Sequence, residues 1–444
     1  MTSLPALGPV PEGLPEALAL VDGLDDALEH GLGRPDDAHL RSLTDLAGAF
    51  AGSPLAAPLS EAAGKIAAGS VTDEHLLAVA GARVALLGAV HDALASQAFA
   101  RTRAPFPDTS PEVSVPSNIR SWLRELAITG WRGVDHEIAA AGARAVPGLL
   151  DDPGQRRLAV LIDGFAAELR AGAPVATLSQ VPSRRWADLW SRALLMPSGE
   201  VPAEPVSGRL LLLGADLREH PTAFQVQVHG LLESGDAVRV VRVTVTAAKV
   251  DTITGPSAWR MLAGVPVLLG ALAGHQSLEL KGMSLTAAGD LLWQEELATP
   301  GEVADPFATA RVLLGTAVAT FPAPLDRHPA ALAEPVLLEG YSSGDEGLDL
   351  GGVVVGVDPL PTAGPLTSEL VSSSSACIGL LRWDAGGWFV RPLAVQATVR
   401  KKVVAVHTGD WALGPTEAKA AKAEAVNGAA VDVLRERAGR LLRK

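Results

Sequence analysis

The chain has 444 residues, of which 48% are hydrophobic and 20% are charged, and its formal net charge is −13. Its single cysteine, Cys377, excludes an intramolecular disulfide and a zinc site built from cysteines. An acidic surface repels phosphate groups, so we expect no nucleic-acid partner. At roughly 100–200 residues per domain, the length predicts two to four domains.

The N-terminal residues MTSLPALGPVPEGLPE contain neither a basic start nor an apolar run, which predicts that no signal peptide is present. The most apolar stretch runs from Met261 to Gly274, and its 14 residues fall short of the about 20 that span a bilayer. We therefore expect a buried helix there, no membrane partner and a cytoplasmic location.

The first half of the chain has apolar residues at the spacing that is typical of helices. Helices are predicted at 14–32, 40–50, 55–66 and 72–98, then from 117 or 118, at 133–145, at 155–171, and from Ser183 to Pro197. Four prolines within 102–117 predict an extended linker, because proline lacks a backbone donor. The first half is thus expected to form two helical domains, residues 1–101 and 118–197.

The second half has the alternating apolar and polar residues of half-buried strands. Strands are predicted at 208–215, 224–228 and 238–245, a hairpin at 278–285 and 291–297, and helices at 257–273 and 303–320. Further strands are predicted at 335–339, 352–357, 377–383, 388–396 and 402–407, before a helix at 415–442. These elements define an α+β domain at 207–333 and a β-rich domain with a C-terminal helix at 334–444.

The predicted fold class is therefore α+β, with a helical N-terminal half, a mixed α+β region, and a small C-terminal β-domain with a terminal helix. Residues 391–444 carry 11 Lys and Arg against 5 Asp and Glu, a net charge of +6. This C-terminal part is the one region from which the sequence predicts a basic patch.

Two stretches carry a resemblance: RWADLWSRAL at 185–194 and LLLGADLREHPTAFQVQVHGLLE at 211–233. They resemble an uncharacterised protein family of high-GC bacteria, whose genes lie beside those for a SWIM zinc-finger protein, a MoxR-type AAA ATPase and a von Willebrand factor A protein. The resemblance implies an accessory role in an ATPase-linked system, with the AAA ATPase or its accessory subunits as partner. It implies no catalytic residue, and the chain has no Walker A sequence of its own.

One string, GYSSG at 340–344, fits the G-x-S-x-G pattern of a serine hydrolase. In that motif a strand-to-helix turn exposes the nucleophile, which would be Ser342 between Gly340 and Gly344. A strand is predicted before the string, but the residues after it, DEGLDLGGVVVGVD, lack a helical pattern. We therefore interpret the string as a turn, and a hydrolase that uses Ser342 is kept as an alternative.

A metal-dependent hydrolase is a further alternative. Asp216 and His220 are four residues apart and would share one face of a helix, although Pro221 and the strand pattern after it favour a loop. Cys377 has no identifiable histidine partner and is interpreted as a buried residue. The chain has no dinucleotide fingerprint and no phosphate loop, and we expect no cofactor and no metal site.

Two pairs of tryptophans are the candidate interaction residues. Trp186 and Trp190 lie one turn apart on a predicted helix, beside Arg185, and Trp383 and Trp388 face each other across a predicted turn. Tryptophan and arginine are enriched at protein–protein hot spots, although tryptophans also pack in ordinary cores. On the helix, we expect Trp190 to pack in the core and Trp186 to lie at its edge.

The sequence favours a non-catalytic scaffold or adaptor that binds another protein, and the resemblance adds an AAA ATPase system as its setting. The support is mainly that no complete catalytic constellation is found. Besides the two hydrolase alternatives, a small-ligand-binding module is kept as an alternative, with a pocket between the sheet at 208–300 and the helix at 257–273.

Overall fold

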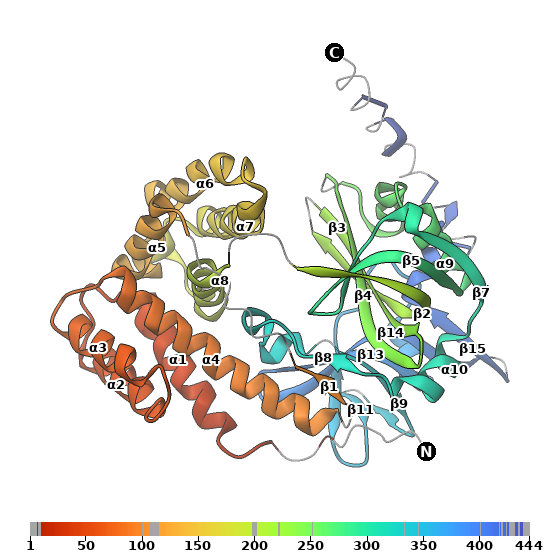
Figure 1. Cartoon of the computed structure of the whole chain (residues 1–444), viewed down its shortest axis with the longest axis horizontal. Coiled ribbons are helices and arrows are strands. Elements are labelled where there is room, and N and C mark those ends of the chain that lie inside the picture. Colours follow the sequence, from red (N-terminus) through yellow and green to blue (C-terminus); the bar gives the residue numbers. More distant parts are fainter. Residues whose placement is uncertain are drawn as a thin grey trace.

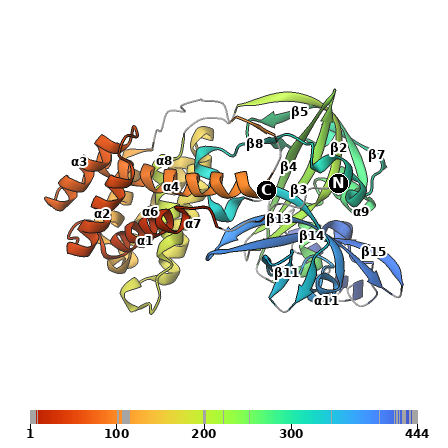
Figure 2. The same cartoon turned by 90° about the horizontal axis from the view of Figure 1, so that it is seen from below.

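The structure of the chain is a computed structural model. It describes residue 7 and residues 10–99, 102–105, 115–197, 202–220, 223–250, 252–332, 334–344, 346–399 and 401–416, together with residues 418, 421–422, 424–425, 431–433 and 436–437. A helical body, residues 14–195, lies beside a β body that contains two larger sheets (Figures 1 and 2). The fold is α+β, which confirms the predicted fold class.

The helical body has a single hydrophobic core. Its helices are α1 (Leu14–His30), α2 (Asp37–Ala49), α3 (Ala56–Ala67), α4 (Asp73–Ala98), α5 (Ser117–Thr129), α6 (His136–Leu150), α7 (Arg156–Gly172) and α8 (Ser183–Leu195). Their apolar faces meet in one cluster that includes Leu24 of α1, Leu76 of α4 and Trp190 of α8. The cluster contains residues from both predicted helical domains, so these two segments pack together, and the division between them stays a prediction.

Helix α4 extends from the helical body into the β body (Figures 1 and 2). Thr72 caps its start by accepting a hydrogen bond from the backbone N–H of His75 at 3.4 Å. Leu76 packs in the core of the helical body, whereas Leu94 packs in a second cluster with Leu338 of the β body. Among the described helices, α4 is long and apolar enough to cross a membrane, and 56% of its most apolar window is buried inside the protein.

The first sheet closes on itself and forms a barrel. It consists of β2 (Ala203–His220), β3 (Ala223–Ser234), β4 (Ala237–Ala248), β5 (Gln276–Thr286), β6 (Asp290–Leu292) and β7 (Ala298–Val303). The order β2-β3-β4-β6-β5 returns to β2, because β5 also pairs with β2, and β7 pairs with β5. Helix α9 (Pro266–Gly274) and the 3₁₀ helix Gly255–Leu262 supply Leu268, Leu272 and Trp259 to its core.

The second sheet is built around one long strand. Its strands are β9 (Glu334–Glu339), β10 (Ser342–Gly344), β11 (Gly347–Asp349), β12 (Val354–Val357), β13 (Ser374–Asp384), β14 (Gly387–Val399) and β15 (Lys402–His407). β14 pairs with β13 on one side, and on the other side with β12 near its start and with β15 near its end. The short helix α11 (Ser368–Ser372) precedes β13.

A bulge in β2 decides which of its side chains face the second sheet. Before the bulge, Leu211 packs between the two sheets and Leu212 packs inside the barrel. The register shifts between Leu212 and Gly214, which reverses the alternation, so that Asp216 faces the second sheet. Gly214 has a φ of 152°, and a Cβ there would lie 2.7 Å from the Cβ of Leu393 on β14. Glycine therefore allows the two sheets to approach each other at this point.

Three predicted elements differ in the structure. The helix at 257–273 is divided, because Pro266 has no N–H to donate to a preceding turn and instead begins α9. The strand at 291–297 ends at Leu292, and a 3₁₀ turn, Glu295–Leu297, separates it from β7. The helix at 303–320 is shorter: α10 (Pro306–Thr309) and a π turn (Ala310–Leu314) form its helical part, and residues 319–320 form a strand instead.

Two further predictions fall partly outside the described residues. In the linker at 102–117, residues 106–114 lie outside them, and Arg103–Ala104 forms β1, which pairs in parallel with β8 (Ala319–Thr320). In the C-terminal helix at 415–442, the described residues 418, 421–422, 424–425, 431–433 and 436–437 are helical. Residues 415–416 are described and are not helical, and the rest of that segment lies outside the described residues.

Candidate functional sites

Ser342 does not lie on a strand-to-helix turn. It is exposed at the start of β10 and pairs with Asp349 of β11. The segment therefore belongs to a β-hairpin. The string was interpreted as a turn, but its last three residues form a strand, and no helix follows them as the hydrolase motif requires. Asp345, next to the string, lies outside the described residues.

Cys377 is buried, as the sequence predicts, on β13. Burial raises the pKa of its thiol to about 12. Because the thiolate is the nucleophilic form, Cys377 is chemically inert at neutral pH.

The strand β2 keeps Asp216 and His220 apart. The segment is neither a helix nor a loop, and both residues belong to this strand. Four residues of strand extend over about 13 Å, so the two side chains cannot bind one metal ion. The metal-dependent alternative built on this pair is therefore wrong.

Both tryptophans of α8 are buried. Trp190 is 0% exposed and donates its indole N–H to the carbonyl of Leu123 at 2.9 Å, as predicted for a core residue. Trp186 is only 2% exposed, and its ring meets that of Trp131 edge to face at 6.4 Å. The prediction that Trp186 lies at the edge of the core is wrong, because Trp131 of the 3₁₀ helix Trp131–Gly133 packs against its ring. Arg185 is exposed and binds the carboxylate of Glu168 at 2.9 Å.

Trp383 and Trp388 face each other across the β13–β14 hairpin, as predicted. They are direct partners in the strand register, and their ring centroids are 5.1 Å apart at an angle of 81°. Both rings are buried in the cluster that the second sheet shares with α4. Their position is thus one of core packing, and a role in partner binding stays a prediction.

A cleft of about 210 Å³ lies where β2 meets β14. The buried carboxylate of Asp216 accepts hydrogen bonds there from Arg218 at 2.8 Å and from Arg391 at 3.1 Å. Arg391 also reaches Asp358 at 3.3 Å, which Arg382 binds at 2.7 Å. Arg382 also binds Asp384 at 3.2 Å, so the three guanidinium groups are matched by three carboxylates, and the network serves mainly to link the two sheets.

The space predicted as a ligand pocket, between the first sheet and residues 257–273, is packed with side chains. Trp259 and Leu268 fill it, and Trp259 donates its indole N–H to the carbonyl of Ala363 at 2.8 Å.

A second polar cluster joins the end of β15 to the start of β5. His275 binds the carboxylate of Asp410 at 2.7 Å, and this hydrogen bond raises the pKa of His275. The ring of His407 lies 4.3 Å from that of His275, and burial lowers its pKa to about 4. Phe307 covers the other side of His407 at 5.8 Å. The cluster therefore contains one protonatable and one neutral imidazole, beside an apolar ring.

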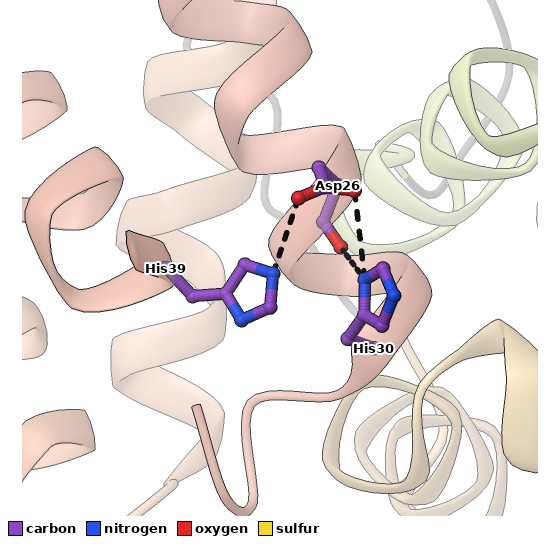
Figure 3. A group of neighbouring side chains, drawn as sticks. All are labelled: Asp26, His30 and His39. Carbon is purple, nitrogen blue, oxygen red and sulfur yellow. Dashed lines mark hydrogen bonds and ion pairs between the residues drawn. The ribbon is translucent and has the colours of Figure 1, made fainter. Parts of the chain in front are cut away.

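A third cluster gathers side chains that the sequence analysis did not group (Figure 3). Asp26 and His30 are one turn apart on α1, and His39 comes from the first turn of α2. One carboxylate oxygen of Asp26 lies 3.1 Å from Nε2 of His39, and the other lies 3.5 Å from Nδ1 of His30. One ligand atom of each residue lies within 4.8 Å of the others. Figure 3 shows both rings next to the carboxylate.

The sequence contains a signal for this third cluster. Asp26 and His30 have the i, i+4 spacing that places two side chains on one helical face, inside a predicted helix. His39 stands just before the next predicted helix. What the sequence could not give was the angle at which α2 folds back on α1.

The molecule is thus an α+β protein with a helical body, two packed sheets and a histidine–aspartate cluster at its surface. Comparison of the chain with models of protein families, with curated proteins and with solved structures finds no match. The resemblance noted in the sequence stays a prediction.

Proposed function

We propose that the protein is a non-catalytic adaptor that binds an extended, acidic segment of another protein along the open edge of β15. The proposal rests on the pairing and the exposure of this edge strand. Among the described strands, β15 pairs with β14 alone, and it leaves Val403 69% and Val404 39% exposed. An unpaired edge presents backbone N–H and C=O groups to which a partner strand can add.

The charge of this edge favours an acidic partner. Lys401 and Lys402 are exposed at the start of β15. Lysine on an edge strand disfavours pairing with the same edge of a second copy, because like charges would meet. An acidic segment of a different protein would bring opposite charges together and cover both valines.

The candidate nucleophiles support a non-catalytic role. Ser342 lies in a β-hairpin without the helix of its motif, and the Cys377 thiol is buried and neutral. The resemblance noted in the sequence makes a MoxR-type AAA ATPase and its accessory subunits the first partners to test.

The test is a selection of random twelve-residue peptides displayed on phage against the folded protein, followed by titration of the enriched peptides. We expect the enriched peptides to be acidic and rich in residues that favour strands. They should bind the Val403→Asp and Val404→Asp variants at least tenfold more weakly than they bind wild type. Val303→Asp, at a valine that is 74% exposed at the end of β7, is the matched control and should bind like wild type. If the selected peptides bind the two β15 variants as well as they bind wild type, this edge is not the docking surface.

A further inference from the structure

We propose that Asp26, His30 and His39 bind a divalent transition-metal ion, with zinc as the favoured ion, at the junction of α1 and α2. The site lies on the helical body, so the inference is independent of the docking edge on β15. Two imidazole nitrogens and one carboxylate oxygen form the ligand set of many zinc sites and of facial-triad iron sites. Magnesium and calcium prefer oxygen ligands alone, so this set selects against them.

The spacing of the ligand atoms fits such an ion. Zinc binds nitrogen and oxygen at about 2.0–2.2 Å, which places two ligands of a tetrahedral site roughly 3.3–3.6 Å apart. The carboxylate of Asp26 lies 3.1 Å from His39 Nε2 and 3.5 Å from His30 Nδ1, close to that range. The two rings are stacked with centroids 5.0 Å apart. Nδ1 of His30 also donates a hydrogen bond to the backbone carbonyl of Asp26 at 3.0 Å, so the half-exposed ring must rotate and release this bond before it can bind the ion.

A fourth residue, Asp36, positions His39. Its Oδ1 caps α2 by accepting hydrogen bonds from the backbone N–H groups of Ala38 at 2.8 Å and His39 at 2.9 Å. The same oxygen lies 3.1 Å from Nδ1 of His39. A carboxylate at Nδ1 favours the tautomer in which Nε2 carries the free lone pair, and Nε2 is the atom that faces Asp26. Metal-binding histidines commonly have such a carboxylate behind them.

The cluster is open to solvent on one side. The side chains of Asp26 and His30 are 59% and 50% exposed, whereas that of His39 is 9% exposed. A metal ion can therefore enter without opening the fold. Three protein ligands would leave a position for water or for a side chain of a partner. The bound ion would also fasten the end of α1 to the start of α2 across residues 31–36.

The test is isothermal titration calorimetry of the full chain with Zn²⁺ alone. Wild type is expected to bind one ion, and Asp26→Asn and His30→Ala are each expected to bind it at least tenfold more weakly. Both side chains are exposed, so these variants keep the fold. Asp36→Asn should weaken binding by about tenfold without removing a ligand. The matched control is His136→Ala, at an exposed histidine between Asp135 and Glu137 on another helix, which should bind like wild type.

A second measurement separates a site from adventitious binding. Hydrogen exchange of the amides between residues 26 and 40 should slow when Zn²⁺ is added to wild type, and should not change in His30→Ala or His39→Ala. Mg²⁺ at the same concentration should have no effect. The proposal is overturned if Asp26→Asn and His30→Ala bind Zn²⁺ like wild type, if His136→Ala loses as much affinity as they do, or if Mg²⁺ protects the same amides. The three residues would then be a hydrogen-bonded surface cluster only.

Discussion

The helical body and the β body bury their side chains in different ways. In the helical body, aromatic rings meet inside one core: Phe165 contacts Trp122 at 5.6 Å and Trp131 at 6.1 Å, and Trp131 contacts Trp186 at 6.4 Å. In the β body, the sheets divide the apolar residues among three clusters, one of which also includes the end of α4. Amphipathic helices can bury their apolar faces in one common core, whereas each sheet has two faces against which other elements pack.

The two bodies also differ in the polar groups that they bury. Asp216 and Asp358 lie between or beside the sheets, and His229 is 2% exposed on β3. In the helical body the buried charges of Arg83 and Asp25 form a pair at 2.7 Å. Burial raises the pKa of Asp25 to about 6, so a fall in pH through this range does not destabilise the helical body through this group, and we expect acid to destabilise mainly the β body.

The largest expected effect is on packing in the helical body. Trp190→Ala should lower the free energy of unfolding by about 3–5 kcal/mol, and Trp186→Ala by a similar amount, because each removes a buried indole ring. Urea unfolding followed by circular dichroism measures both. Arg185→Ala, at an exposed residue of the same helix, is the control and should cost less than about 1 kcal/mol. A loss below 1 kcal/mol for Trp190→Ala would mean that the helical core does not depend on this ring.

An intermediate effect is expected from acid on the β body. Burial lowers the pKa of His229 to about 3, while an unfolded histidine titrates near 6.5. Between these values the unfolded state binds a proton that the folded state does not, so stability is lost as the pH falls below 6.5. The slope from this group is at most about 1.4 kcal/mol per pH unit.

Urea unfolding at pH 7, 6 and 5 measures that slope, and His229→Gln should flatten it. Hydrogen exchange at pH 5 shows which body opens. The strands around His229 should exchange before the helices α5 to α8. If the helices open first, the contrast between the two bodies does not hold.

The smallest expected effect concerns the contact between the sheets. Arg391→Met should cost only about 1 kcal/mol, because the side chain is 33% exposed and the two carboxylates keep Arg218 and Arg382 as partners. A double-mutant cycle with Asp216→Asn measures the coupling. Arg239→Met, which removes an exposed pair with Glu204, should show none. Equal coupling in the two cycles would mean that the network does not hold the sheets together.

The elements that could be predicted are those with a local pattern. The apolar spacing in 72–98 identifies one helix and the alternation in 223–245 identifies two strands, because both patterns depend only on residues that are close in the sequence. Strand β2 was predicted only at 208–215, although it spans Ala203–His220. Its register shifts at Gly208 and Gly214 interrupt the alternation on which the prediction depended.

The contacts that could not be predicted join distant parts of the chain. Arg391 and Asp216 are 175 residues apart, and the local spacing paired Asp216 with His220 instead. Trp186 was expected at the edge of the core from its place near the start of its helix, but Trp131 of a 3₁₀ helix distant in the sequence packs against it. The cluster of Asp26, His30 and His39 depends on the turn between two helices, which hydrophobic spacing does not describe. Local pattern thus predicts the elements, while long-range packing decides the sites.

Helix α4 has a mechanical consequence. Its 26 residues form a rod of about 39 Å, at about 1.5 Å per residue, and its two ends are held in different cores. Tension applied to β15 by a bound partner would pass through the second sheet and along the axis of this rod into the helical body. The backbone hydrogen bonds of a helix run nearly parallel to that axis, so the rod resists such a load together with the pair of Arg192 and Asp326, which also joins the two bodies at 2.6 Å.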